Sequence, residues 1–343
     1  AVFCFLALVA AACGSSSKSG GSGGSSHTTL NGSGSTFQKT FDQAAIAAFK
    51  QKNPNVTINY AGGGSGKGKT DLQTKTVDFA GTDSLIKAAD KPNYQGGDVL
   101  YFPTVSAPIT VSYKLSGLDK VQLSATALAK IFSGQAKKWN DAAIAQDNPG
   151  VNLPSTNIVI VHRADASGTT SNFTKFLVKA AGSAWTLGAG DTITWPADSQ
   201  AGQGNQGVAQ IIGQTDGAIG YVDYSDAVAA SLTFASIKNA AGKFLPPTLQ
   251  GAEAAVNNAT IAPDLTYSPL DSPGADAYPL TAPTWIIAYA KQTDKAKGQA
   301  LKDFLNFILT DGQQLAQPVN YAPLPDSLRQ KAIAQLSNIQ IPA

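Results

Sequence analysis

Short apolar runs alternate along the chain with longer segments in which apolar residues recur every three or four positions. The short runs predict β-strands at Val56–Tyr60, Val77–Ala80, Ile109–Tyr113, Ile158–Val161, Ala218–Val222 and Trp285–Tyr289. The periodic segments predict helices at Phe37–Lys50, Ala125–Phe132, Thr170–Ala180, Val208–Ile212, Lys297–Leu309 and Ser327–Leu336. This interleaving favours an α/β fold with mainly parallel sheets, in which ligands bind where the carboxyl ends of strands lead into helices.

The first residues have the pattern of a targeting segment. Residues 1–12 are continuously apolar but shorter than the roughly 20 residues that span a bilayer as a helix, and small residues precede Cys13. We expect a signal-peptide remnant at 1–12, whose start is missing because the chain begins at Ala1. Residues 9–16 (VAAACGSS) resemble a bacterial lipobox and make Cys13 the expected lipid attachment site, although Ala10 stands where Leu is commoner. An ordinary buried helix with an incidental cysteine is the alternative. Residues 13–29 are rich in Gly and Ser and predict a flexible tether.

Composition narrows the function classes. The 343 residues suggest two domains, and 43% hydrophobic residues suffice for a sizeable core. Charged residues make up only 14% and the net charge is +2, which disfavours a nucleic-acid partner. Both cysteines, Cys4 and Cys13, lie at the N-terminal edge, and the only histidines are His27 and His162. We therefore expect no disulfide, thiol nucleophile, metal centre or cofactor in the globular part.

Three turns that lead into predicted helices are rich in hydrogen-bond donors: residues 34–37 (GSTF), 62–68 (GGGSGKG) and 163–169 (RADASGT). Each turn offers backbone N–H groups, small residues and hydroxyls at a helix N-terminus, where anions are favoured. One such turn is ordinary helix capping. Three together, with Arg163 in one of them, predict a site for a tetrahedral oxyanion.

The second turn also matches the P-loop pattern G-x-x-x-x-G-K-[ST] at residues 63–70, so a nucleotide hydrolase is an alternative. Against it, the strand at Ile158–Val161 runs into His162 and Arg163, and no later apolar strand ends in an aspartate placed to hold Mg²⁺. The expected lipobox also places the chain outside the cytoplasm.

Several segments together resemble the phosphate-binding proteins of high-affinity phosphate ABC transporters. They are residues 30–37 (LNGSGSTF), 64–66 (GSG), 76–83 (TVDFAGTD), 131–134 (IFSG), 138–141 (KWND), 163–169 (RADASGT), 217–222 (GAIGYV) and 321–325 (YAPLP). The resemblance extends from Leu30 to the C-terminus, and residues 163–169 are its most specific part. The sequence departs from the usual pattern at Lys67 and Lys69, and at Ser84, where Ala-Pro is frequent after the aspartate.

The resemblance implies a class II periplasmic-binding-protein fold: two α/β lobes joined by a two-crossing hinge, with the ligand in the cleft. Residues 30–112 and 285–343 would form lobe one, and residues 113–284 would form lobe two. The crossings would lie near Tyr113 and Thr284.

The resemblance also implies which residues of this sequence bind phosphate, and they come from both lobes. They are Thr36, Phe37, Ser65, Asp83, Arg163, Ser167, Gly168 and Thr169, with Asp165 orienting Arg163 from behind. Asp83 would be the acceptor in the site. Phosphate near pH 7 keeps at least one proton and can donate to a carboxylate, whereas sulfate cannot.

We therefore expect a lipid-anchored, extracytoplasmic and monomeric receptor that captures inorganic phosphate. It would deliver phosphate to membrane permease subunits driven by a separate ATPase, and would not be an enzyme. A binding protein of the same fold for sulfate or molybdate is the alternative, and a phosphatase-like enzyme is a further one.

Overall fold

The computed structural model describes residues 27–343, so the predicted signal-peptide remnant, Cys13 and most of the predicted tether lie outside the described residues. The strands are β1 Thr28–Gly34, β2 Val56–Ala61, β3 Phe79–Thr82, β4 Val99–Tyr113, β5 Gln122–Leu123, β6 Val159–Arg163, β7 Gln200–Gly202, β8 Ala218–Asp223, β9 Thr233–Phe234, β10 Ser236–Lys238, β11 Phe244–Leu245 and β12 Thr281–Tyr289. The α-helices are α1 Lys39–Lys52, α2 Ser65–Gln73, α3 Ala125–Phe132, α4 Ala142–Asp147, α5 Gly168–Ala181, α6 Gly204–Gln214, α7 Tyr224–Ala229, α8 Leu249–Asn257, α9 Lys295–Leu309 and α10 Asp326–Gln335. Short 3₁₀ helices are η1 Ala88–Asn93, η2 Gly182–Ala184, η3 Asp311–Leu315, η4 Gln317–Val319 and η5 Leu336–Asn338.

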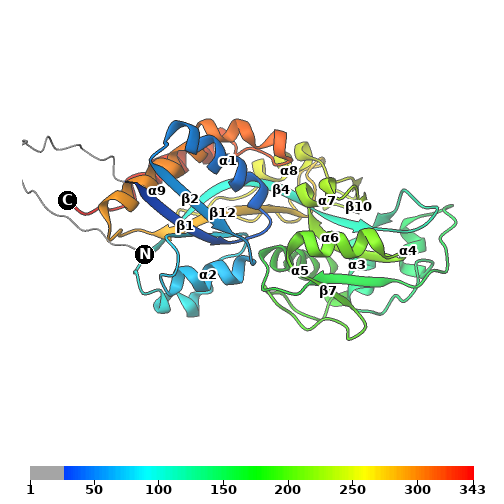
Figure 1. Cartoon of the computed structure of the whole chain (residues 1–343). Helices are drawn as coiled ribbons and strands as arrows, with labels where there is room; N and C mark the ends of the chain where they lie inside the picture. Colours follow the sequence, from blue (N-terminus) through cyan, green and yellow to red (C-terminus); the bar gives the residue numbers. More distant parts are fainter. Residues whose placement is uncertain (1–26) are drawn as a thin grey trace, which may run out of the picture.

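Two α/β lobes lie side by side, as Figure 1 shows, with both ends of the described chain in the same lobe. A nine-stranded sheet runs through the molecule in the order β2-β1-β3-β12-β4-β8-β6-β7, with β9 added to β4. β1, β2 and β3 are parallel to one another in one lobe, and β6, β7 and β8 are parallel in the other. A small sheet of β11, β10 and β5 lies apart from the main one.

The two lobes are joined by the long strands at the centre of this sheet. β12 pairs antiparallel with β4 up to Pro108, and β4 pairs antiparallel with β8 from Ile109 onward. β4 therefore changes its partner between Pro108 and Ile109, without a break in the strand. The lobe boundaries at residues 112/113 and 284/285 stay a prediction, but this exchange lies a few residues before the expected crossing near Tyr113.

All the predicted helices and strands are present, but the expectation of mainly parallel sheets is wrong at the centre. β12 is antiparallel to both β3 and β4, because these strands carry the chain back and forth between the lobes. β1 was not predicted, since Leu30 is its only large apolar residue. It begins at Thr28, inside the predicted tether, because Thr28 and Thr29 pair with β2.

Polar side chains cap the starts of six of the ten α-helices in the described part of the chain. The side-chain oxygens that accept first-turn N–H groups belong to Ser124, Asp141, Ser167, Asp223, Thr248 and Asp294. Each such cap satisfies a donor that the helix itself leaves without a partner. The capped start of α5 is the one that enters the candidate site.

Aromatic residues build the core of both lobes. In the first lobe the stripe predicted for α1 is buried, and Phe49 packs edge-on against Phe304 of α9 with ring centroids 5.3 Å apart. In the second lobe Phe173 stacks on Tyr221 at 4.5 Å. Burying such rings stabilises each lobe independently of the cleft between them.

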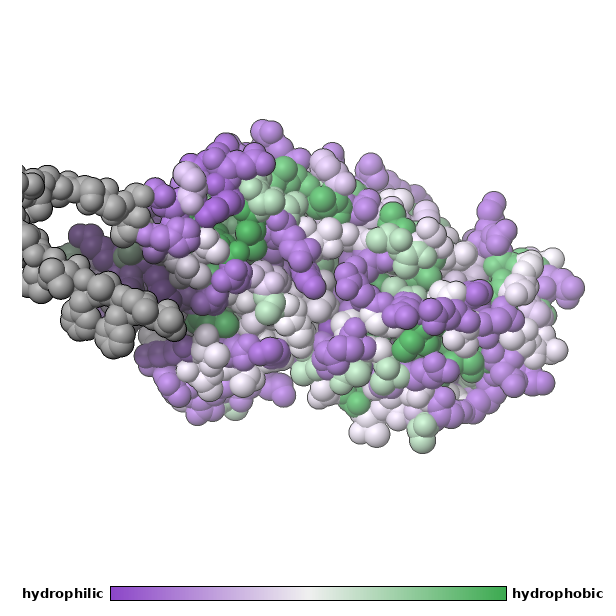
Figure 2. Space-filling model, in the orientation of Figure 1, coloured by the Kyte–Doolittle hydropathy of each residue, from purple (hydrophilic) through white to green (hydrophobic). Residues whose placement is uncertain are grey.

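The surface of the molecule is mainly hydrophilic, in keeping with the burial of the aromatic residues in the two cores. Figure 2 shows hydrophilic residues over most of the visible face, with apolar residues in small patches. Within residues 27–343, no helix has the length and apolar character needed to cross a bilayer.

Candidate functional site

The donor-rich turns meet between the two lobes. In the first lobe the carboxyl ends of β1, β2 and β3 lead to Ser35, Ser65 and Asp83, and because these strands are parallel their ends share one edge. In the second lobe Arg163 ends β6, and the turn after β7 leads into α6. The structure thus places the candidate residues at the carboxyl ends of strands in both parallel groups, and their role in binding a ligand stays a prediction.

Asp83 is the buried acceptor of this region, with 3% of its surface exposed. Its Oδ1 accepts from Ser35 Oγ at 2.5 Å and from Thr284 Oγ1 at 2.8 Å, and Ser65 Oγ lies 3.3 Å from Oδ2. Burial raises the pKa of Asp83 to about 6, although the hydroxyl donors and the charge of Arg163 oppose the shift. At neutral pH the group is therefore mainly an ionised carboxylate that three hydroxyls support.

Arg163 is also buried and is held by a neighbouring carboxylate. Its Nε donates to Asp165 Oδ1 at 2.8 Å, its Nη2 pairs with Oδ2, and its Nη1 donates to Thr169 Oγ1 at 3.2 Å. The backbone N–H of Gly204 donates to the same carboxylate. Burial disfavours ionisation of Asp165, but Arg163 outweighs it and lowers the pKa of that carboxyl. The guanidinium is thereby fixed in one orientation.

The first turn of α5 lies directly against the Asp83 segment. A Cβ atom at Gly168 would lie only 2.5 Å from Ser65 Oγ and 2.7 Å from Asp83 Cβ, so glycine is required for this approach. Ser167 caps the helix, its Oγ accepting from Thr170 N at 3.1 Å. The first N–H groups of such a helix have no acceptor within the helix and carry partial positive charge.

Thr36 and Phe37 lie at the entrance to α1. Thr36 Oγ1 accepts from Asn205 Nδ2 at 3.1 Å and from Asn205 N at 3.3 Å, which links it to the second lobe. The backbone N–H of Phe37 donates to Ser35 Oγ at 3.0 Å, and its ring is fully buried. The structure therefore brings all the sequence-predicted ligands to one region, with Thr36 reaching Thr169 through Asn205.

The lobes are in contact across the site. Asn172 Nδ2 donates to the Asp83 carbonyl at 2.6 Å, and the N–H of Gly66 donates to the Ala166 carbonyl at 2.9 Å. Lys69 of α2 forms an ion pair with Asp191 of the other lobe at 2.6 Å, where both side chains are largely shielded from solvent. These contacts define a closed arrangement of the two lobes.

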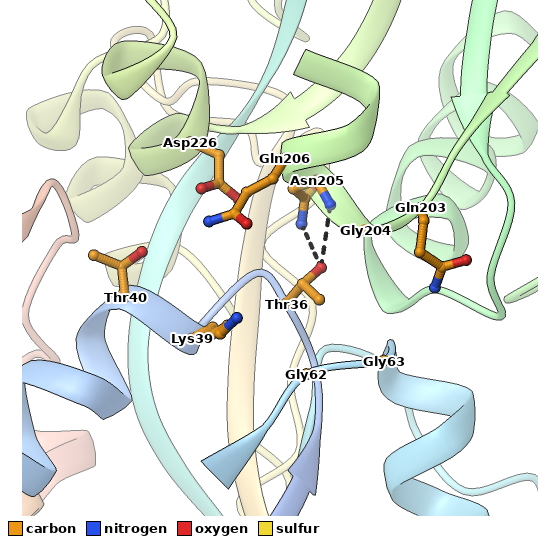
Figure 3. A pocket seen from close by; sticks show the side chains of 10 residues that line it. All are labelled: Thr36, Lys39, Thr40, Gly62, Gly63, Gln203, Gly204, Asn205, Gln206 and Asp226. Carbon is orange, nitrogen blue, oxygen red and sulfur yellow. Dashed lines mark hydrogen bonds between the residues drawn. The ribbon is translucent and has the colours of Figure 1, made fainter. Parts of the chain in front are cut away.

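A cavity of about 320 Å³ opens beside this region. Figure 3 shows Thr36 and Lys39 on one wall and Asn205, Gln206 and Asp226 on the other, with Thr36 bonded to Asn205 across the gap. The cavity shares Thr36 with the predicted site, and Asp83 and Arg163 do not line it. It therefore lies at the outer rim of the closed site.

The P-loop alternative does not fit the structure. Helix α2 begins at Ser65, so most of the predicted phosphate loop, including Gly68 and Lys69, is already helical. Lys69 pairs with Asp191, and Lys67 pairs with Asp71 at 2.5 Å along the helix. No group of three or more metal-ligating side chains occurs in the part of the chain that the structure describes.

Four residues of the site were not singled out from the sequence: Ser35, Thr284, Asn172 and Asn205. Ser35 stood within the predicted donor-rich turn and could have been found there. Thr284 directly precedes a predicted strand, and it reaches Asp83 only because β12 lies beside β3. Asn172 and Asn205 act across the lobes, a contact for which the sequence has no local signal.

The sequence and the fold place the chain in a known class of proteins. The sequence matches the family model described as the PBP superfamily domain over residues 19–312. A solved structure of a high affinity periplasmic phosphate-binding protein, PfluDING, superposes with a TM-score of 0.74 at 22% identity, covering 90% of this chain and 93% of that one. A phosphate-binding protein from Stenotrophomonas maltophilia superposes with a TM-score of 0.70 at 20% identity, covering 90% and 93%. The two-lobed fold expected from the sequence is confirmed.

Relatives with a higher sequence identity define the family more narrowly. The phosphate-binding protein PstS of Pasteurella multocida is 34% identical over 314 residues, covering 90% of this chain and 89% of the relative. That of Methanocaldococcus jannaschii is 35% identical, covering 84% and 80%, and PstS 2 of Mycobacterium tuberculosis is 33% identical, covering 97% and 95%. The chain belongs to the PstS family of phosphate-binding proteins.

Proposed function

We propose that this protein captures inorganic phosphate between its two lobes. The observation that carries the proposal is the buried carboxylate of Asp83, supported by three hydroxyls and facing the first turn of α5 and Arg163. The proposed ligands are Thr36, Phe37, Ser65, Asp83, Arg163, Ser167, Gly168 and Thr169. Asp165 would orient Arg163 without touching the anion.

The chemistry of Asp83 favours phosphate over other oxyanions. A carboxylate among anion-binding donors repels a fully ionised ligand, but it accepts a hydrogen bond from one that keeps a proton. Phosphate keeps a proton near neutral pH and sulfate does not. A buried polar group that only one ligand can satisfy discriminates strongly against the other. The sulfate and molybdate alternatives are therefore disfavoured.

The transport role extends this proposal to partners. Relatives named as phosphate-binding proteins PstS support delivery of phosphate to permease subunits of an ABC transporter with a separate ATPase. We propose that the protein works outside the cytoplasm as a monomer, anchored through Cys13, and that it binds its ligand without chemical turnover.

Calorimetric titration of the protein with phosphate and with sulfate, at pH 6 and pH 8, tests the proposal. We expect saturable phosphate binding with a stoichiometry of one and no heat of binding from millimolar sulfate. Equal binding of both anions would show that Asp83 does not select the ligand, and absence of phosphate binding would refute the function. Release of a chromogenic alcohol from a phosphate ester would instead indicate an enzyme.

A further inference from the structure

Asp42 is a second buried carboxyl group, and it lies outside the candidate site. It belongs to the first turn of α1 and is 1% exposed. Its Oδ2 accepts from Gln38 Nε2 at 2.8 Å, and its Oδ1 has no hydrogen-bond partner in the described part of the chain. The titratable groups whose charges act with it are Tyr60 of β2, Tyr321 and Asp83. An ionised carboxylate held in this way is poorly compensated.

A continuous line of polar groups connects Asp42 to Asp83. Gln38 Oε1 contacts Thr284 Oγ1, and Thr284 Oγ1 lies 2.8 Å from Asp83 Oδ1. All four side chains are fully buried or nearly so. The line therefore passes from the first turn of α1 through the hinge strand β12 to the proposed ligand acceptor.

The hydrogen atoms along this line allow two consistent arrangements. The Thr284 hydroxyl carries one hydrogen but has both Gln38 Oε1 and Asp83 Oδ1 as acceptors. If Asp42 is ionised, the Gln38 nitrogen faces it, and the Gln38 oxygen attracts the Thr284 hydrogen away from Asp83. If Asp42 is protonated, the Gln38 amide can turn over, since its oxygen and nitrogen exchange with almost no change of shape. Gln38 then donates to Thr284, and Thr284 donates to Asp83.

We propose that Asp42 and Gln38 are positioning residues which, with Asp42 as a neutral acid, direct the Thr284 hydroxyl onto Asp83. This inference rests on the proposed function, because it assigns Asp83 as the phosphate acceptor. Each of the three contacts along the line Asp42–Gln38–Thr284–Asp83 then joins one donor to one acceptor. Burial, which raises the pKa of Asp42 to about 8, supports the neutral form near pH 7.

The proposal has a consequence for ligand binding at alkaline pH. Ionisation of Asp42 would withdraw one donor from Asp83 and add a negative charge near the anion site, and both effects weaken phosphate binding. One pH unit above a pKa of about 8, only about a tenth of Asp42 stays protonated, so the affinity falls by up to about tenfold from this cause, the limit being reached if the ionised form binds no phosphate. Phosphate also loses protons over this range, but that change is common to all variants and cancels between them.

The experiment compares the ratio of the phosphate Kd at pH 9 to that at pH 7 in wild type and Asp42→Asn, measured by calorimetry. Asparagine can donate to Gln38 as the neutral acid does, but it does not ionise. We expect the ratio to be smaller in the variant, by up to about tenfold. Asp303→Asn, which removes an exposed negative charge on α9, is the matched control and should keep the wild-type ratio. Equal ratios in wild type and Asp42→Asn would overturn the proposal.

A second measurement does not depend on phosphate. The titration of Asp42 is followed by carboxyl ¹³C NMR in phosphate-free buffer, with Asp42→Asn identifying the signal, in wild type and Thr284→Val. Valine keeps the shape of threonine but removes the hydroxyl in the middle of the line. We expect the pKa of Asp42 to change in Thr284→Val, although the two residues do not touch. An unchanged pKa would refute the relay even if wild type bound no phosphate, whereas absent phosphate binding alone would refute only the proposed function.

Discussion

Gly168→Ala should weaken phosphate binding without lowering the free energy of unfolding. Gly168 is the first residue of α5, and its neighbours across the cleft are Ser65 and Asp83 of the other lobe. A Cβ atom here would lie 2.5 Å from Ser65 Oγ, whereas ordinary contacts begin near 3.4 Å. The lobes must therefore stay apart by a further ~0.9 Å at this point, a displacement comparable to the 1 Å that can cost 100-fold in a preorganised site.

The expected loss of phosphate affinity is about 100-fold, or ~2.7 kcal/mol. This magnitude equals one or two hydrogen bonds to a charged group, at roughly 1.5–3 kcal/mol each. The free energy of unfolding should be unchanged or slightly higher, because alanine favours a helix by up to ~1 kcal/mol over glycine. The steric conflict is relieved when the lobes open, so it does not require either lobe to unfold.

Calorimetry with phosphate and thermal unfolding in phosphate-free buffer measure the two effects. Gly213→Ala in α6 is the matched control, since a Cβ atom there meets only Leu232 Cδ2 at an ordinary 3.6 Å. Gly66→Ala should act like Gly168→Ala, because its Cβ atom would lie 2.3 Å from Ala166 Cβ across the cleft. Wild-type affinity in Gly168→Ala would show that the closed contacts described above are not those of the ligand-bound protein.

Four further outcomes are expected. Asp83→Asn should lower the preference for phosphate over sulfate at least tenfold in competition calorimetry, because the amide can donate to sulfate; a variant that still ignores millimolar sulfate contradicts the assigned role. Arg163→Ala should weaken phosphate binding more than ~100-fold, because it removes a donor and leaves the buried carboxylate of Asp165 without its ion-pair partner. Lys67→Ala should change the affinity less than ~3-fold. Comparable losses in the two variants would mean that the anion lies elsewhere. Lys69→Met breaks the ion pair between the lobes and should speed phosphate release roughly 3- to 10-fold in stopped-flow experiments; an unchanged rate would show that this pair does not hold the lobes closed. Burial raises the pKa of Asp42 from 3.8 to about 8, so the contribution of its neutral form to stability is present below about pH 4 and is lost as the pH rises through 8. The melting temperature of wild type should therefore fall over this range more than that of Asp42→Asn. Parallel melting curves of the two proteins against pH would argue against the raised pKa.

The sequence predicted the elements better than their arrangement. Helices such as α3 and α5 have strong apolar periodicity and capping residues, so their positions follow from local rules. β1 was missed because its small polar residues become a strand only through pairing on both sides, with Gly32 making room for the ring of Phe79. β4 was predicted only from Ile109, since Pro103 and Pro108 are unusual inside a strand.

The candidate site was likewise predicted only where its residues lie close together in the sequence. Residues that form continuous motifs, such as Arg163 and Asp165, were placed together by sequence, and the structure shows them as an ion pair. Thr284 and Asn205 reach the site through strand order and lobe contact, which no local pattern encodes. The cross-lobe role of Lys69 was likewise hidden, because its partner Asp191 lies 122 residues away.

The charges of the site explain why helix ends matter for an anion here. Arg163 is neutralised by Asp165, and Asp83 adds one further negative charge, so the side chains alone do not attract phosphate. The compensating field must come from neutral dipoles. Helices α1, α2 and α5 all begin at this cleft, and each N-terminus carries roughly half a positive charge. Together they offset the surplus carboxylate, and they do so only when both lobes present their helices to the same ligand. In the proposed mode of binding, closure is therefore part of the binding energy, because the donors of α5 would reach an anion held by α1 and α2 only in the closed arrangement.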